Sequence, residues 1–140
     1  MKRLAPLACV ALLVLGLFAG LRPASAEGDA PAPDLSGTWK LSGWNPGTAR
    51  DGKPDYTGSV ALESKGKGTY VVSWTVNGKV VNTGVGLWDD RTRAFAAGYA
   101  VQGKPGAAVF RLSEDGKVLD CVGVYMGKMG EIGHEEFRRE

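Results

Sequence analysis

The sequence predicts an all-β domain, an eight-stranded antiparallel up-and-down (meander) β-barrel, and three observations favour it. Short runs rich in β-branched and aromatic residues alternate with clusters of Gly, Asn, Asp and Pro roughly every ten residues. No segment of helical length carries apolar residues at the spacing i, i+3, i+4, i+7. The links between the runs are short, so strands that follow one another in the chain should be neighbours in the sheet.

Eight strands are expected, at residues 36–43, 56–64, 69–77, 79–88, 93–101, 107–113, 117–126 and 130–138. An open meander would leave two unpaired edges, and pairing the first strand with the last removes both. A two-sheet β-sandwich of the same strands is the alternative. Charged or small residues on one face of several strands favour a barrel in water over one in an outer membrane.

The clearest turn is Asn77-Gly78, because Asn and Gly accept the two positive φ angles of a type I′ hairpin. A regular ladder from this turn pairs Val76 with Lys79 and Trp74 with Val81. One face of the hairpin then forms part of the core. That face carries Tyr70, Val72, Trp74, Val76, Val81 and Val85.

The start of the chain has the pattern of a secretory signal peptide. Lys2 and Arg3 precede an apolar stretch from Leu4 to Leu21, and Ala24-Ser25-Ala26 supplies a small-x-small cleavage site. We therefore expect residues 1–26 to be removed and the protein to be periplasmic or secreted. No membrane span is expected after signal removal.

After that cleavage we expect a flexible leader at residues 27–35 and a single barrel domain at residues 36–138. Three of the 17 basic residues leave with the signal, so 14 Lys and Arg remain against 15 Asp and Glu. A near-neutral chain lacks the clustered basic charge that phosphate backbones require, so no nucleic-acid partner is expected. Cys121 is then the lone cysteine, so an intrachain disulfide cannot form. We expect its side chain to be buried as a small apolar group.

Metal and catalytic signals are sparse, and we expect no metal, no cofactor and no enzymatic activity. His134 is the only histidine, and one His with one Cys cannot supply a tetrahedral zinc site. If the last hairpin turns at Lys128-Met129, His134 pairs with Gly123 and shares a face with other reactive side chains. These are Cys121, Tyr125 and Glu136. The best catalytic candidates are therefore Tyr125, His134 and Glu136, for isomerase or cyclase chemistry.

Aromatic residues at strand positions suggest a different site. A barrel mouth lined with aromatic rings can hold an apolar or planar ligand. The expected ligand-binding residues are Trp39, Tyr70, Trp74, Tyr99, Phe110 and Tyr125. The longest connection, residues 44–55, is either a lid over that mouth or a plain surface turn.

Two resemblances add to this reading. Gly37-Thr38-Trp39 resembles the Gly-x-Trp start of the first strand in the lipocalin and avidin superfamilies, which are meander barrels. Avidins carry a biotin-binding Asn shortly after this motif, and Leu41 stands there in this chain, so biotin binding is not carried over.

The broader resemblance is to a loosely defined family of small exported bacterial proteins, some of them labelled fibronectin-binding. It implies the architecture and supplies no catalytic residues. The motifs that carry it are Tyr56-x-Gly58-x-Val60-x-Leu62, Tyr70-x-Val72-x-Trp74, Gly84-x-Gly86, Gly98-Tyr99, Val109-Phe110 and Asp115-Gly116-Lys117-x-Leu119.

Together these patterns predict an exported, non-catalytic binding protein with a small hydrophobic or planar ligand in the barrel mouth. The first alternative is a protein-binding module for an extracellular-matrix or cell-envelope partner. The second alternative is a small-barrel isomerase or cyclase. A monomer and a homodimer both fit the sequence.

Overall fold

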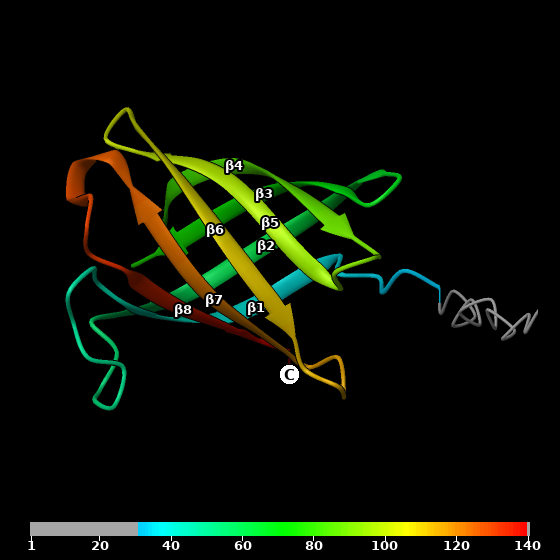
Figure 1. Ribbon diagram of the computed structural model, residues 1–140, viewed down its shortest axis with the longest axis horizontal. Helices are drawn as coiled ribbons and strands as arrows, with labels where there is room; N and C mark the ends of the chain where they lie inside the picture. The colour runs from blue at the N-terminus through cyan, green and yellow to red at the C-terminus, as the bar shows by residue number, and fades with distance from the viewer. Residues whose placement is uncertain (1–30, 140) are drawn as a thin grey trace, which may run out of the picture. The chain divides into compact units, whose positions relative to one another are not determined.

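The computed structural model describes residues 31–139, which form one closed antiparallel barrel of eight strands (Figure 1). Each strand pairs with the next along the chain, and β1 pairs with β8, so the predicted meander barrel is confirmed. The predicted signal peptide, residues 1–26, lies outside the described residues. The strands are β1 (Gly37–Trp44), β2 (Tyr56–Gly66), β3 (Thr69–Val76), β4 (Lys79–Asp89), β5 (Ala94–Val101), β6 (Lys104–Leu112), β7 (Val118–Tyr125) and β8 (Gly133–Arg138).

A single 3-10 turn at Met126–Lys128 is the only helical element in residues 31–139. Nothing in that described range is a helix with the length and apolar character needed to cross a bilayer.

Three two-residue hairpin turns have positive φ at both positions, and one of them is Lys67-Gly68 between β2 and β3. Asn77 and Gly78 have φ angles of 51° and 72°, which confirms the predicted type I′ turn. Gln102 and Gly103 have φ angles of 50° and 77° and form another turn of this kind. The strand β6 therefore begins at Lys104, three residues before the start expected at residue 107.

The predicted register of the β3–β4 hairpin is right for one pair and wrong beyond it. Val76 pairs with Lys79, but a bulge between Trp74 and Thr75 makes Trp74 pair with Asn82 instead of Val81. The extra residue reverses the faces of β4. Val81 and Val85, predicted to be core, are 53% and 69% exposed.

The β7–β8 register is also one residue away from the prediction. Gly123 pairs with Gly133, so His134 lies opposite Val122 and Glu135 lies opposite Cys121. The reason is that β7 ends before the 3-10 turn and β8 begins only at Gly133, so no tight turn forms at Lys128-Met129. This difference decides which side chains of β8 enter the barrel.

Aromatic side chains fill one end of the lumen. Tyr70, Phe95, Phe110 and Phe137 make successive ring contacts, with centroid distances of 5.6, 5.5 and 4.7 Å. Leu35 adds to this core although the sequence placed it in the leader: it is 1% exposed, and its carbonyl accepts a hydrogen bond from the Trp39 indole at 3.0 Å. This end of the barrel is a packed core and leaves no room for a ligand.

Candidate functional site: a cavity in the barrel mouth

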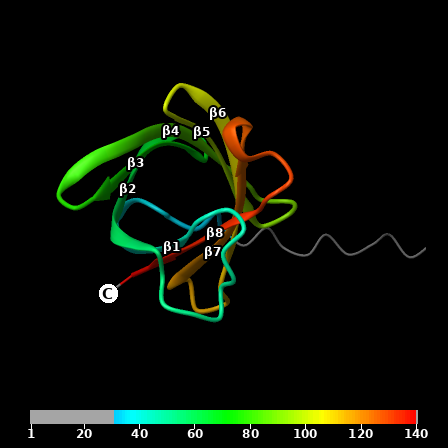
Figure 2. The same ribbon diagram turned by 90° about the vertical axis from the view of Figure 1, so that its left-hand side faces the viewer.

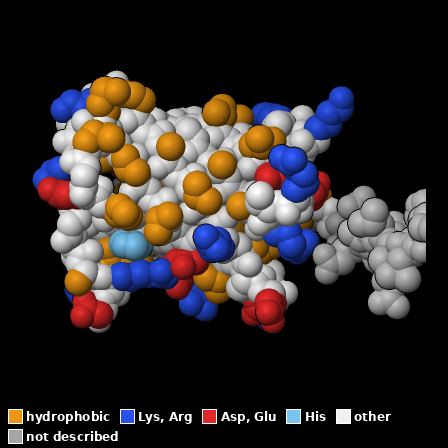
Figure 3. All heavy atoms as spheres, viewed as in Figure 1, with side chains coloured by type: hydrophobic (Ala, Val, Ile, Leu, Met, Phe, Trp, Pro, Cys, Tyr) orange, Lys and Arg blue, Asp and Glu red, His pale blue; other side chains and the backbone are white. Residues whose placement is uncertain are grey.

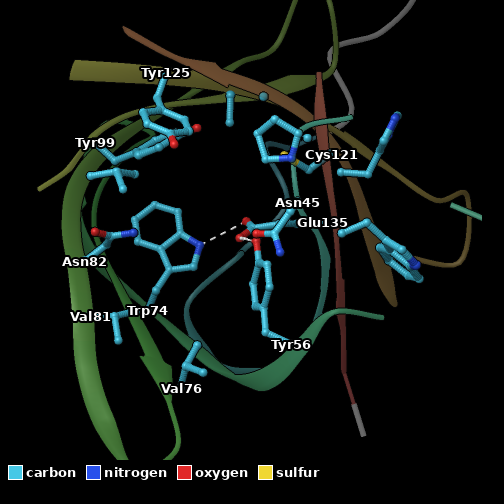
Figure 4. Close-up of a pocket in the computed structure, with 17 residues that line it drawn as sticks. Asn45, Tyr56, Trp74, Val76, Val81, Asn82, Tyr99, Cys121, Tyr125 and Glu135 are labelled. Atoms are coloured by element: carbon cyan, nitrogen blue, oxygen red, sulfur yellow. Dashed lines mark hydrogen bonds between the residues drawn. The ribbon is translucent and has the colours of Figure 1, made fainter. Parts of the chain in front are cut away.

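The opposite end of the barrel, which faces the viewer in Figure 2, holds a cavity of about 310 Å³. The connections β1–β2, β3–β4, β5–β6 and β7–β8 surround it. Its size falls at the lower end of the range for ligand sites in proteins. Most of its wall is apolar or aromatic, from residues that include Tyr56, Trp74, Val76, Tyr99, Ala108, Cys121 and Tyr125 (Figure 4).

The structure brings together three of the six residues expected to bind a ligand. Trp74, Tyr99 and Tyr125 line the cavity, and the rings of Trp74 and Tyr99 lie 5.7 Å apart. The other three, Trp39, Tyr70 and Phe110, belong to the closed core at the far end. Strand alternation identifies the inward face but not the height along the barrel axis, so the sequence could not separate the two groups.

The polar centre of the cavity is the carboxylate of Glu135 on β8. Its Oε1 accepts a hydrogen bond from the Tyr56 hydroxyl at 2.8 Å, and its Oε2 accepts one from the Trp74 indole Nε1 at 3.0 Å (Figure 4). Burial raises the pKa of Glu135 above its usual value, and the two hydrogen bonds oppose that rise. Glu135 was not among the residues expected from the sequence, because the predicted register placed its neighbours His134 and Glu136 on the inner face instead.

Small residues make room for the rings of the site. Gly43 pairs with Tyr56 across β1 and β2, and a methyl group at Gly43 would overlap the Tyr56 ring. Gly106 lies between Tyr99 and Tyr125, and a methyl group there would press on both. These glycines therefore allow three aromatic side chains to lie over the barrel wall beside the cavity.

Three ionisable groups near Glu135 have raised pKa values and are neutral near pH 7. Burial, with a smaller contribution from the Glu135 charge, raises the pKa of Tyr99 to about 12. The same two causes raise the pKa of Tyr56 and of the Cys121 thiol. In residues 31–139, no lysine or arginine lines the cavity. The site is therefore a carboxylate surrounded by neutral donors and aromatic rings.

The residues proposed for catalysis are not assembled into one cluster. Tyr125 lines the cavity, whereas Glu136 lies on the outer wall and forms ion pairs with Arg50 and Arg138 at 3.5 and 2.8 Å. His134 lies at the cavity rim opposite Val122, and its buried Nδ1 has no hydrogen-bond partner in the described chain.

The long β1–β2 connection is fastened to the outside of the barrel. Arg50 forms an ion pair with Asp120 at 2.5 Å and lies over the Trp44 ring at 5.5 Å. Only its first residues, Asn45 and Pro46, reach the cavity rim. This geometry fits a surface turn that borders the mouth and does not cover it.

No family model matches the sequence, and no curated protein matches it significantly. Across residues 31–139, no group of three or more His, Cys, Asp or Glu side chains is placed to hold a metal ion. The geometry of the cavity is therefore the basis for assigning a function.

Proposed function

We propose that this protein is an exported, non-catalytic binding protein that takes a small, partly apolar or planar ligand in the mouth of its barrel. The observation that carries the proposal is the cavity of about 310 Å³, with aromatic walls and one carboxylate. At ~30 Å³ for each water molecule, this volume corresponds to a ligand of about ten non-hydrogen atoms. A ring system with one polar substituent has this size.

The arrangement of the reactive groups favours binding over catalysis. A nucleophilic cysteine needs a lowered pKa, whereas burial raises the pKa of Cys121. Both oxygens of Glu135 are held by fixed neighbours, as in a group that orients a ligand. The three residues considered for isomerase chemistry do not meet around a common point.

The test places a larger side chain on the cavity wall, where it occupies the space proposed for the ligand. Ala108 on β6 is 4% exposed and lines the cavity, while its neighbour Ala107 is on the outer face. We expect isothermal titration with 2-naphthol, a planar neutral probe, to show one site in the unaltered protein. Ala108→Leu should abolish binding, and the matched control Ala107→Leu should retain it. Unaltered binding in Ala108→Leu, or no binding by the unaltered protein, would refute the proposal.

A second candidate, a protein-binding module, is favoured by an apolar patch on the outside of the barrel. Register aligns Leu87, Ala96, Val109 and Val122 in one row across β4 to β7, and Val85, Gly98, Ala107 and Val124 in the next. The valines and the leucine of these rows are 37% to 69% exposed. Hydrophobic side chains are spread over this face in Figure 3, with charged side chains near its margins. Exposed apolar patches of this kind mark interaction surfaces.

The first partner to test for this outer patch is a second copy of the chain. Val109 lies near its centre, so Val109→Lys should dissociate a dimer detected by sedimentation equilibrium. Ala61→Lys, a change at an exposed position on β2, is the control and should leave the dimer intact. A protein that stays monomeric up to millimolar concentration would remove self-association from consideration.

A further inference from the structure

We propose that the ligand of this cavity is a small organic cation, an ammonium group on an aromatic or aliphatic body, held by Glu135. This inference rests on the proposed binding function and specifies its ligand class. The geometry that points to it is a carboxylate inside an aromatic cavity whose wall, within residues 31–139, holds no lysine or arginine. The imidazole of His134 borders the rim, but His134 precedes Glu135 on β8, and successive strand residues point to opposite faces.

Glu135 has no lysine or arginine as a counter-charge in the cavity wall of residues 31–139. Glu135 is half-buried. A carboxylate withdrawn from water is normally paired with a cation, because removing a lone charge from water is costly. Glu135 has two neutral donors, the Tyr56 hydroxyl and the Trp74 indole, and neither neutralises its charge. A carboxylate offers about four lone-pair positions, so two donors leave capacity for a third group. An ammonium group supplies both the proton donors and the charge.

The aromatic walls of the cavity also favour a cation. Rings of Tyr56, Trp74, Tyr99 and Tyr125 border the same cavity (Figure 4). The faces of aromatic rings carry negative charge density and attract cations, and tryptophan is the strongest of them. The combination of aromatic walls and one carboxylate repels an anion, accepts a neutral molecule and favours a cation.

A competing interpretation uses the same carboxyl group in its protonated form. Burial raises its pKa, so a neutral Glu135 would donate a hydrogen bond to an uncharged ligand. In that case a neutral ligand would bind at least as well as a cation of the same shape. The two interpretations therefore differ in the charge of the preferred ligand.

The test compares three probes with one phenyl ring and similar length by isothermal titration of the exported protein at pH 7. They are 2-phenylethylamine, 2-phenylethanol and 3-phenylpropanoate. Aliphatic amines of this kind are protonated at that pH. We expect the amine to bind about tenfold or more tightly than the alcohol, since charge-assisted hydrogen bonds are roughly twice as strong as neutral ones. The carboxylate probe should bind most weakly.

Substitutions at two neighbouring glutamates distinguish contact between the ligand and Glu135 from the overall electrostatic field of the protein. Glu135→Gln keeps the shape and removes the charge inside the cavity, so the preference for the amine should disappear while the alcohol still binds. Glu136→Gln removes the adjacent charge on the outer wall and should leave the preference unchanged. Circular dichroism verifies that each variant is folded.

The outcomes distinguish the inference from the function beneath it. If the unaltered protein binds the alcohol as tightly as the amine, the proposed preference for a cationic ligand is wrong and the binding function stands. A preference that survives in Glu135→Gln overturns the assignment to this carboxylate. Failure of all three probes and of 2-naphthol overturns the binding function as well. The probe series on the unaltered protein decides the charge preference even if a variant does not fold.

Discussion

Replacing Tyr56 by Phe tests whether the Glu135 carboxylate is charged and held inside the barrel. The change keeps the ring and removes only the hydroxyl that donates to Oε1 at 2.8 Å. A hydrogen bond to a charged group contributes about 1.5–3 kcal/mol, and one between neutral groups about 0.5–1.5 kcal/mol. We therefore expect Tyr56→Phe to lower the free energy of unfolding by about 1.5–3 kcal/mol where Glu135 is ionised, and by the smaller amount where it is protonated.

The pH dependence of this loss has a definite sign. Because burial raises the pKa of Glu135, the folded chain retains a proton that the unfolded chain has already released. This carboxyl group therefore makes stability fall as pH rises from the usual glutamate pKa through the raised one. Tyr56→Phe removes a hydrogen bond that lowers the pKa of Glu135. The pKa in the folded chain then lies further above the pKa in the unfolded chain, so the stability lost through the substitution grows as pH rises.

The assay is urea unfolding followed by tryptophan fluorescence between pH 4.5 and 9. It uses the unaltered protein, Tyr56→Phe, Glu135→Gln and the double variant. Other titrating groups cancel in the differences between these proteins. In the Glu135→Gln background the loss caused by Tyr56→Phe should be about 0.5–1.5 kcal/mol at every pH, as for a neutral hydrogen bond. A loss that is independent of pH, or equal in both backgrounds, would show that Tyr56 does not donate to an ionised Glu135.

Two further predictions concern packing. Gly86→Ala should destabilise the protein by about 1–3 kcal/mol in urea unfolding, because the new methyl group overlaps the buried Phe95 ring. Gly98→Ala, which has open space and no positive φ, should be neutral or slightly stabilising; equal losses in both variants would contradict this packing. Cys121 is 2% exposed with a raised thiol pKa, so at neutral pH it should react with iodoacetamide much more slowly in the native protein than after unfolding; equal rates in the two states would be inconsistent with this environment.

The sequence could predict the architecture because the relevant signals are local. Asn77-Gly78 dictates a tight turn by its backbone preferences alone, and the structure has the two positive φ angles that the dipeptide predicts. Alternation and short links then leave few topologies, and closure of the meander removes the two edges.

The site was harder to predict because it depends on register, and register accumulates errors. A bulge after Trp74 adds one residue to β4, and no residue type in the sequence indicates where it lies. The 3-10 turn before β8 causes a similar slip. Each slip of one residue exchanges the two faces of a strand, so the sequence placed Val81 in the core and His134 beside Gly123.

The consequence of that slip is largest in Gly133-His134-Glu135-Glu136, where neighbouring residues have opposite roles. Glu135 enters the cavity, and Glu136 forms ion pairs on the outer wall. The two glutamates are chemically identical, so only the pairing of β8 with β7 and β1 assigns their roles. Correct pairing at one position, Cys121 opposite Glu135, would have revealed the acidic cavity from the sequence.

The two ends of the barrel contribute to the free energy of unfolding with opposite signs. The Glu135 carboxylate has no cationic partner in the mouth, which raises the free energy of the folded chain. Part of that cost remains after the Tyr56 and Trp74 hydrogen bonds form. The closed end offsets it, because Phe95, Phe110 and Phe137 are fully buried there, and each large buried side chain contributes about 1.5–3 kcal/mol. A ligand that neutralises Glu135 removes the remaining cost, so ligand binding should stabilise the fold most where this carboxylate is ionised.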